Sequence, residues 1–336
     1  MLNINKLQKY KHMKTKQILS LVALSIVLFF QVSCSSNTDK KNESNKNELS
    51  GSISISGAFA LYPMVVKWAE EFQKINPNVR IDVSAGGAGK GIADVLQNMV
   101  DIAMVSREIK VEEIQKGAWF IAVTKDAVVP VINASNPVFS EIQKKGITKT
   151  QLASLFTENK KITWGKIYSA NNKSNINVYN RSDACGAGEM WAKFFNIKQE
   201  DLLGTGVFGD PGIADAVKND INGIGYNNVI YAYDLKSRVL YPGLAIIPID
   251  LNENGVLEPD ENFYQNLDSI TNAIRTNRYP SPPARELFLV TKGKTTNPIV
   301  LAFYNWILTD GQKYINEGGY VKLTDENIKS QIEKLK

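Results

Sequence analysis

Hydrophobic and polar positions alternate with two different periods along this chain. Residues 52–56 alternate serine and isoleucine, the period of two that is typical of a half-buried strand. The apolar residues that follow recur three and four positions apart: Leu61, Val65, Trp68, Phe72 and Ile75. This spacing predicts an amphipathic helix, which Asn76 and Pro77 should end.

Short apolar strands and amphipathic helices succeed one another over the rest of the chain, which predicts an α/β fold. Further strands are expected at 79–84, 100–105, 119–124, 127–133, 177–180, 223–226, 244–249 and 287–290. Further helices are expected at 91–99, 148–156, 262–277 and 297–308. Roughly 285 residues follow position 50, more than one core usually serves, so we expect two lobes.

The first 33 residues are typical of an export signal. Five lysines precede an apolar run at 18–32, which is shorter than the roughly 20 residues that span a bilayer. Met13 is an alternative start, since Met13-Lys14-Thr15-Lys16 is itself a good opening for a signal. The run ends at Val32-Ser33-Cys34, which resembles a bacterial lipobox, so we expect Cys34 to be lipidated after cleavage. The alternative is an ordinary cleaved signal with an incidental cysteine.

The segment after Cys34 has the composition of a linker. Residues 37–50 are almost all lysine, asparagine, glutamate and serine, and Leu49 is their one large apolar residue. Because such a composition cannot bury a core, residues 34–50 are predicted to be a flexible tether. Lipid and tether together predict an exported lipoprotein, anchored to a membrane and facing the periplasm or the cell exterior.

Composition excludes several classes of function. Without the first 33 residues the chain has 34 basic and 34 acidic residues, which gives no support for nucleic-acid binding. The single histidine, His12, lies in the signal, so the mature chain has no His-dependent catalysis and no typical zinc site. Cys185 is the only cysteine besides Cys34, so no internal disulfide is expected. We expect no enzyme activity and no cofactor for activity.

Three glycine-marked turns each close a predicted strand and open a predicted helix. They are Ser56 to Ala60, Gly86 to Gly91, and Arg181 to Gly188. A helix N-terminus leaves backbone N–H groups unpaired and carries partial positive charge, and glycine lets the backbone close around a small anion. Because the third turn also carries Arg181, the three turns together predict a receptor for a compact anion.

These segments resemble the phosphate-binding receptors of bacterial ABC transporters, the PstS family. The order and spacing of the three turns match, and residues 223–226 and 319–321 resemble later family landmarks. The resemblance implies a type II periplasmic-binding-protein fold, with two α/β lobes, two crossover strands and a ligand in the interlobe cleft. It implies lobe one at 51–124 plus 244–330 and lobe two at 125–243. It also implies a monomer that delivers inorganic phosphate to an inner-membrane ABC permease.

The resemblance carries the family's ligand positions onto this chain residue by residue. They are Phe59, Ala60, Ala88, Gly89, Lys90, Ser106, Arg107, Arg181, Cys185, Gly186 and Ala187. The family's hydroxyl residues are replaced at four of them: Phe59, Ala88, Cys185 and Ala187. Ser106 stands where the family has a carboxylate that accepts the proton of hydrogen phosphate and repels sulfate. These departures put affinity and discrimination against sulfate in question.

Other roles compete for the side chains of these segments. Arg181 has Asp183 and Glu189 near it in sequence as ion-pair partners, and Lys90 and Arg107 are as well suited to solvated or cross-lobe salt bridges. Cys185 fits a small buried contact better than a reactive nucleophile, because no base is evident nearby. Two tryptophans, Trp164 and Trp191, are expected in the core rather than in a ligand platform.

Residues 250–261 fit the twelve-residue calcium-loop pattern of EF-hands. The expected ligands are Asp250, Asn252, Asn254, the backbone carbonyl of Val256, Glu258 and Glu261. Gly255 takes the sixth position of the pattern. The loop resembles the lone structural calcium site of some other periplasmic binding proteins, and we expect a structural staple rather than a switch. The alternative is an acidic turn without a metal.

Three functions remain besides phosphate capture for an importer. The same fold could bind another oxyanion or a small carboxylate, which the replaced hydroxyls favour. A secreted phosphate-ester hydrolase needs a nucleophile with a base or a metal cluster, and the mature chain has no histidine. A structural or adhesive lipoprotein is the remaining alternative.

Overall fold

The structure is a computed structural model that describes residues 48–168 and 171–336. The predicted signal and the lipidation site at Cys34 lie outside the described residues. None of the described helices is both long and apolar enough to cross a membrane.

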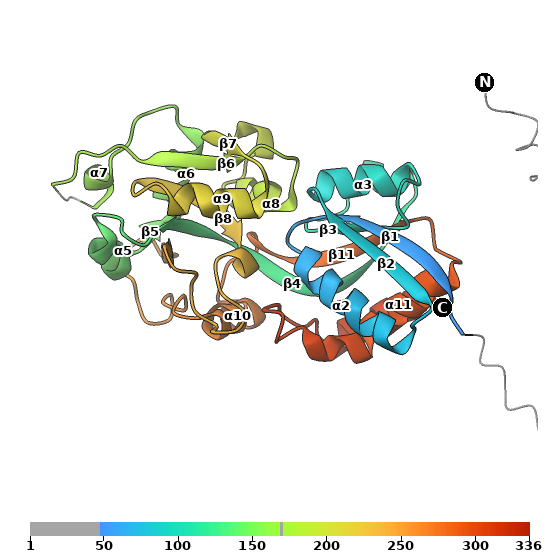
Figure 1. Ribbon diagram of the computed structural model, residues 1–336. Coiled ribbons are helices and arrows are strands. Elements are labelled where there is room, and N and C mark those ends of the chain that lie inside the picture. Colours follow the sequence, from blue (N-terminus) through green and yellow to red (C-terminus); the bar gives the residue numbers. More distant parts are fainter. Residues whose placement is uncertain (1–47, 169–170) are drawn as a thin grey trace, which may run out of the picture. The chain divides into compact units, whose positions relative to one another are not determined.

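A mixed sheet of nine strands organises this part of the chain (Figure 1). Its order is β2-β1-β3-β11-β4-β8-β6-β7, and β9 also pairs with β4. The bounds are β1 Gly51–Gly57, β2 Val79–Ala85, β3 Ile102–Val105, β4 Ala118–Asn133, β6 Asn177–Arg181, β7 Thr205–Val207, β8 Gly223–Asn228, β9 Leu244–Ile246 and β11 Ala284–Lys292. The strands β1–β3 pair in parallel, as do β6–β8, and the antiparallel β4 and β11 join these two groups. A separate small sheet pairs β5 (Ile147–Thr148) with β10 (Ile249–Asp250).

The strand β4 is continuous where the sequence pattern predicts two strands. Its first part pairs with β11 as far as Ala127, and its second part pairs with β8 and β9. Lys125 and Asp126 interrupt the apolar run at the junction, which explains why the pattern looks like a break. Because β4 and β11 run side by side from one half of the sheet to the other, they are the two predicted crossover strands.

Helices pack on both groups of strands. Their bounds are α2 Tyr62–Ile75, α3 Ala88–Leu96, α4 Val111–Gln115, α5 Phe139–Lys145, α6 Lys149–Thr157, α7 Trp164–Tyr168, α8 Gly186–Phe194, α9 Gly209–Lys218, α10 Leu267–Arg275, α11 Pro298–Leu308 and α12 Asp325–Leu335. Short 3-10 helices lie at Gln199–Asp201, Val229–Tyr231 and Asp310–Tyr314. Helix α3 begins three residues earlier than predicted, because Gly87 makes its turn at a φ of +92°. Helix α10 is shorter than predicted, because the Asn266 side chain caps it by accepting from the Ser269 N–H.

Two hydrophobic cores divide these elements into two lobes. The first core gathers buried residues of 53–123 and 287–320, together with Ile230, and the second gathers buried residues of 127–284, together with Val321. We therefore use lobe one for 48–124 plus 285–336 and lobe two for 125–284. The predicted return to lobe one at residue 244 is wrong by about 40 residues. The apolar pattern of 244–249 indicates a strand but not its sheet, and β9 pairs with the lobe-two part of β4.

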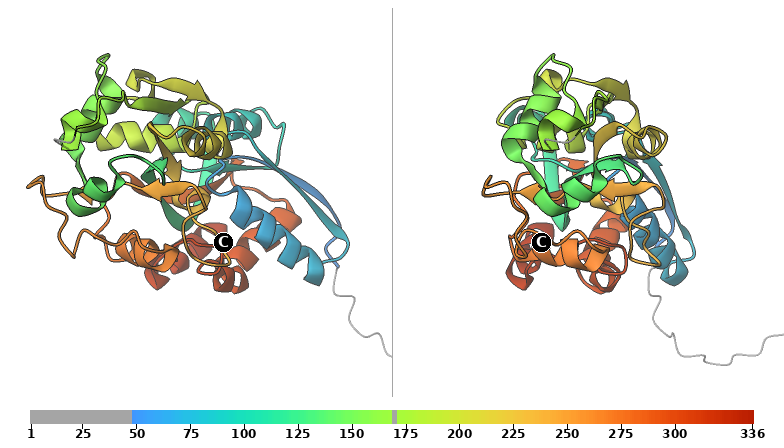
Figure 2. Two further views of the ribbon diagram at one scale, coloured as in Figure 1. Left: turned by 60° about the vertical axis from the view of Figure 1, so that its left-hand side comes forward. Right: turned by 90° about the vertical axis from the view of Figure 1, so that its left-hand side faces the viewer.

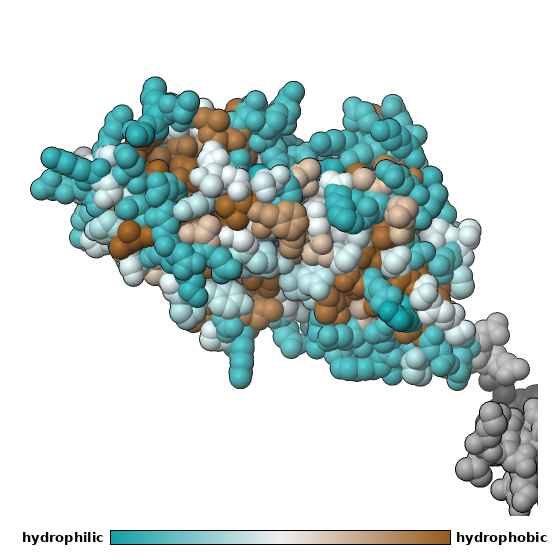
Figure 3. All heavy atoms as spheres, turned by 45° about the horizontal axis from the view of Figure 1, so that its top comes forward, coloured by the Kyte–Doolittle hydropathy of each residue, from teal (hydrophilic) through white to brown (hydrophobic). Residues whose placement is uncertain are grey.

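The first and last segments of the fold lie side by side in lobe one. In Figure 2 the blue helix α2 lies beside the red C-terminal helices in both views, and α2 contacts α11. Green, yellow and orange segments build most of lobe two, and the orange part includes α10. The face shown in Figure 3 is mostly hydrophilic, with apolar atoms mainly in its hollows.

Candidate functional site

Arg181, at the end of β6, is the most buried charge of the predicted site. Its Nε and Nη2 donate to the two carboxylate oxygens of Asp183 at 2.7 and 2.6 Å, and its Nη1 donates to Asp210 Oδ2 at 2.6 Å. The side chain is 1% exposed. Burial alone would lower the pKa of Arg181, but the negative charges of Asp210 and Asp183 raise that pKa above its ordinary value. Of the two partners that the sequence offers, Asp183 is the one that pairs with it.

Asp210, at the start of α9, completes this cluster and was not predicted. Its Oδ1 accepts from the backbone N–H of Asn228 at 3.0 Å and from the Asn228 side-chain amide at 2.6 Å. The side chain is fully buried. A carboxylate in the first turn of a helix is favoured by the helix dipole, which is the signal the sequence offered in Gly209-Asp210. Its partners come from β6 and β8, so local sequence does not identify them.

A second buried guanidinium, Arg285 on the crossover strand β11, extends the network. Its Nε donates to the backbone oxygen of Ser106 at 3.2 Å, and its Nη2 donates to Asn228 Oδ1. Its Nη1 lies 3.7 Å from Asp126 Oδ2 on β4, and neither atom has a hydrogen-bond partner among the described residues. Burial raises the pKa of Asp126 to about 6 against the opposing charge of Arg285. Asn228 thus links Arg285 to Asp210, which is the partner of Arg181.

The three glycine turns meet here. The N–H groups of Gly86 and Gly87 in the second turn donate to the Gly57 carbonyl of the first turn at 2.9 and 3.0 Å. The Gly89 N–H at the start of α3 donates to the Ala184 carbonyl of the third turn at 3.0 Å. A Cβ on Gly186 would lie 2.2 Å from Ser106 Oγ, and one on Gly87 would lie 2.8 Å from Asp183 Oδ2. Glycine at these positions lets lobe one and lobe two touch backbone to backbone.

Phe59 occupies the space over the arginine. The centroid of its ring lies 5.4 Å from Arg181 Cζ, and the ring packs edge-on against Phe208 at 5.7 Å between centroids. Its carbonyl accepts from the Tyr231 hydroxyl at 3.0 Å. The ring therefore covers one face of the guanidinium at the position where the resemblance implies a hydroxyl.

The remaining small residues of the turns are buried beside these groups. Ala60 accepts from the Tyr320 hydroxyl at 2.7 Å through its carbonyl, and Ala88 and Ala187 are both buried in the first turns of their helices. Cys185 caps α8, since its Sγ accepts from the Gly188 N–H at 3.2 Å. Burial raises the pKa of the Cys185 thiol to about 12, so the thiol stays protonated at neutral pH. Cys185 is thus a buried contact residue and not a thiolate nucleophile.

Two predicted ligand cations make other pairs instead. Lys90 is paired with Asp94 one turn along α3, and its side chain is 55% exposed. Arg107 is held by Glu113 at 2.7 Å and by Glu189 of lobe two at 3.0 Å between Nε and Oε2. Burial opposes its charge, yet the hydrogen bonds and charge of Glu113 raise the pKa of Arg107. Arg107 therefore forms the cross-lobe salt bridge that the sequence left open.

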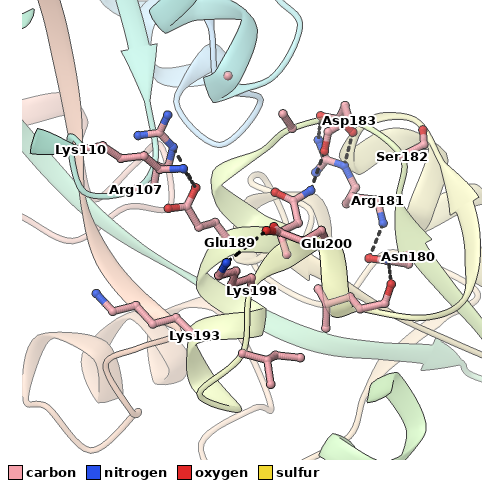
Figure 4. Close-up of a pocket in the computed structure, with 15 residues that line it drawn as sticks. Arg107, Lys110, Asn180, Arg181, Ser182, Asp183, Glu189, Lys193, Lys198 and Glu200 are labelled. Carbon is pink, nitrogen blue, oxygen red and sulfur yellow. Dashed lines mark hydrogen bonds and ion pairs between the residues drawn. The ribbon is translucent and has the colours of Figure 1, made fainter. Parts of the chain in front are cut away.

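A groove of about 910 Å³ opens beside Arg181 between the two lobes (Figure 4). Its lining combines cations of both lobes with carboxylates of lobe two: Arg107, Lys110, Asp183, Glu189, Lys193, Lys198 and Glu200. Figure 4 shows Arg107, Lys110 and Glu189 on one side and the Arg181–Asp183 pair on the other. The two predicted core tryptophans, Trp164 and Trp191, are fully buried away from this lining.

The predicted calcium ligands form a separate loop in lobe two. Glu258 accepts hydrogen bonds from the side-chain amides of Asn252 and Asn254, and Glu261 accepts from backbone N–H groups of the same loop. Within 48–168 and 171–336, no three histidine, cysteine, aspartate or glutamate side chains are grouped so that they could hold a metal ion. The loop as it stands is closed by its own hydrogen bonds.

Comparisons with known proteins agree with this architecture. The family model described as "PBP superfamily domain" matches residues 42–311. Protein SphX of Synechococcus elongatus is 29% identical over 286 residues, which cover 81% of this chain and 77% of the relative. The phosphate-binding protein PstS of Bacillus subtilis is 25% identical over 321 residues, which cover 94% and 96% of the two chains.

Solved structures share the fold. The putative phosphate ABC transporter substrate-binding protein of Clostridium perfringens, solved with bound phosphate, aligns with a TM-score of 0.67 at 23% identity. The alignment covers 82% of this chain and all of the other. An ABC-type phosphate transport receptor from Vibrio cholerae aligns with a TM-score of 0.58 at 17% identity, covering 81% and 100%. The predicted two-lobed α/β fold is thereby confirmed.

Proposed function

The chain belongs to the PBP superfamily and is similar to PstS-type receptors, and from this premise we propose that it captures inorganic phosphate between its lobes for an ABC importer. One observation carries the proposal. The three glycine turns meet around the buried guanidinium of Arg181, in the order that the resemblance implies. The similar protein of Bacillus subtilis is named as a phosphate-binding protein, and the similar structure from Clostridium perfringens was solved with bound phosphate. Both support phosphate as the ligand.

The donors suited to a tetrahedral anion lie on both lobes. Arg181 uses three of its five N–H groups on Asp183 and Asp210, which leaves two for a ligand. The first N–H groups of α8, at Gly186 and Ala187, have no partner within the helix by its geometry, and the helix dipole adds partial positive charge. In a site that excludes water, these fixed donors stabilise an anion more than solvated ones do.

Phosphate reaches these donors only after a movement. The Arg181 side chain is 1% exposed beneath the Phe59 ring, and Gly89 and Ala184 already touch. We propose that the lobes part by bending β4 and β11 at their junction, and that Phe59 turns away as the anion enters. Closure around the anion would then present the surface that a permease recognises. In this account the protein forms and breaks no covalent bond.

A second ligand class, another oxyanion or a small carboxylate, is favoured by specific residues. Phe59, Ala88 and Ala187 provide no side-chain hydroxyl, and Ser106 provides no negative charge against sulfate. Each missing neutral hydrogen bond would weaken phosphate binding by about 0.5–1.5 kcal/mol. The groove is also far larger than a single phosphate ion, and its lysines suit additional carboxylates.

Titration calorimetry of the purified protein with phosphate, sulfate, molybdate and citrate separates the two classes. The proposal predicts binding of phosphate, and loss of that binding in Arg181→Ala. Because Arg181→Ala leaves two carboxylates buried without their partner, circular dichroism must first show that this variant folds. If the variant does not fold, Arg181→Lys takes its place in the titration. A response to citrate alone would refute phosphate as the ligand.

The proposal also includes a lipid anchor at Cys34, which would hold the receptor at the membrane that carries its permease. The lipobox-like Val32-Ser33-Cys34 and the polar segment after it support this part. Metabolic labelling with a radioactive fatty acid tests it directly. Label should appear in the wild type and be absent from Cys34→Ala, which should also leave the membrane fraction. Equal labelling of both would contradict the anchor.

A further inference from the structure

The acidic loop between β10 and α10 has no part in the proposed phosphate site. Its twelve residues, 250–261, hold five carboxylates and no lysine or arginine. None of these carboxylates forms an ion pair within the described part of the chain. A segment with five carboxylates and no cationic partner has the electrostatic character of a site for a hard cation.

Asp250, the first residue of the loop, is buried, and one of its two carboxylate oxygens has no hydrogen-bond partner among the described residues. The residue is 0% exposed, although carboxylates are rarely buried without a partner. Its Oδ2 accepts from the Gly255 N–H across the loop at 2.8 Å, which directs the carboxylate into the loop. Its Oδ1 has no hydrogen-bond partner in 48–168 or 171–336. Such an oxygen costs free energy unless a ligand satisfies it.

The other oxygens that the pattern needs surround the same turn. Asn252 Oδ1 and Asn254 Oδ1 each accept one backbone N–H from two residues further on, at 3.0 and 2.9 Å, which leaves each a second lone pair. Glu261 Oε1 accepts from the N–H groups of Leu251 and Asn252, at 2.8 and 3.2 Å. Glu261, the twelfth residue of the loop, is thereby held against Leu251 and Asn252, the second and third. Gly255 makes the sharp turn at a φ of +85°.

We propose that this loop binds one calcium ion. Its ligands would be Asp250 Oδ1, the side-chain oxygens of Asn252 and Asn254, the Val256 carbonyl, Glu258 and Glu261. Because no three carboxylates of 48–168 and 171–336 are grouped so that they could hold a metal ion, binding requires two rearrangements. Glu258 must leave the amide groups of Asn252 and Asn254, and Glu261 must turn an oxygen inward. This oxygen set suits calcium, which takes six to eight flexible ligands, better than magnesium, which demands a strict octahedron.

The ion would act as a staple in lobe two. The Glu253 carboxylate accepts from the backbone N–H of Thr150 in the first turn of α6 at 2.8 Å, and from the hydroxyl of the same residue at 2.9 Å. The Leu257 N–H donates to the Lys144 carbonyl at the end of α5, and β10 pairs with β5. Calcium would therefore tie the loop to the α5–β5–α6 segment and stabilise it, without contact with the groove beside Arg181.

The thermal stability of the purified protein, stripped with a chelator, tests the proposal. Calcium at about a hundredfold its Kd should raise the unfolding midpoint by about 5 °C or more, and equimolar magnesium should raise it much less. Asp250→Asn and Glu261→Gln should each lose the calcium-dependent rise. Asp260→Asn is the matched control, since this exposed carboxylate has no ligand position and should keep the full rise.

Terbium luminescence provides a second readout that does not depend on stability. The Tyr264 hydroxyl accepts from the Ile249 N–H at 3.2 Å, so this phenol lies beside the start of the loop and can transfer energy to a bound lanthanide. Tyrosine-excited terbium emission should appear in the wild type, fall on addition of calcium, and be absent from Asp250→Asn. No calcium-dependent rise in the midpoint together with no emission would overturn the proposal. Equal responses in Asp250→Asn and Asp260→Asn would also overturn it.

Discussion

The Nη1 atom of Arg181 and the Oδ2 atom of Asp210 lie 2.6 Å apart, in an ion pair that is almost wholly withdrawn from solvent. The pair joins the end of β6 to the start of α9, and Asp183 gives Arg181 a second carboxylate. Because two negative charges already face the guanidinium, an incoming phosphate must share it with both. The pair therefore sets the position of Arg181 and limits how tightly Arg181 holds an anion.

Asp210→Asn should destabilise the protein by about 3–5 kcal/mol, since removing one partner of a buried ion pair leaves the other partner's interactions incomplete. Denaturant unfolding followed by circular dichroism measures the change. Asp215→Asn is the control, because Asp215 is an exposed carboxylate on the same helix and should change stability by less than about 0.5 kcal/mol. Equal effects of the two substitutions would show that the pair contributes little.

Asp126 should make stability depend on pH between about 4 and 6. Burial raises its pKa from the ordinary 3.8 to about 6, so the folded state holds this proton more tightly than the unfolded state. The resulting contribution to stability is complete below pH 4 and is lost as the pH rises through 6. Unfolding free energies measured across this range should show the decline in the wild type relative to Asp126→Asn. Parallel curves for the two proteins would contradict the assignment.

Phe59→Ser should tighten phosphate binding by about threefold to tenfold. The substitution removes the ring that covers Arg181 and restores a hydroxyl, whose hydrogen bond contributes about 0.5–1.5 kcal/mol. Calorimetric titration gives the affinity. Phe208→Ser is the control, since it removes the edge-on ring contact with Phe59 without placing a hydroxyl over the guanidinium. If only the control gains affinity, packing of the rings and not the missing hydroxyl limits binding.

Glu189→Gln should weaken ligand binding by about twofold to fivefold at low salt. Glu189 joins lobe two to Arg107 of lobe one at 3.0 Å, so its charge favours the closed arrangement. The effect should shrink as salt screens the pair, because Glu189 is partly exposed. Glu200→Gln, on the same groove but paired with Lys198 within lobe two, should leave the affinity unchanged. A salt-independent loss would point to another role for Glu189.

Local pattern was enough to predict most strands of the large sheet, several helices and the three turns, because strand and helix periods and glycine turns are properties of short segments. It missed other elements, among them α5, α9, α12 and β7. It was not enough for Asp210, Asn228 and Arg285. Each of these meets partners that are distant in sequence, and only the pairing of β4, β8 and β11 brings them together. Arg285 did leave a signal, as a charged residue entering the apolar strand 287–290. Without the strand order, the sequence does not show which residues Arg285 contacts.

The same limit explains the errors in tracing the chain. Lys125 and Asp126 look like a loop between two strands, yet β4 carries them through the junction of the lobes. Residues 244–249 look like the return to lobe one, yet β9 stays in lobe two. Lys90 pairs with Asp94 one turn along its own helix, which is one of the two roles that the sequence left open.

The crystal structure of the protein with phosphate tests the central proposal most directly. The account predicts one tetrahedral density within about 3 Å of the Arg181 guanidinium and of the backbone N–H groups at the start of α8, with the Phe59 ring displaced. Density confined to the lysines of the outer groove, or an unliganded Arg181 at saturating phosphate, would contradict it.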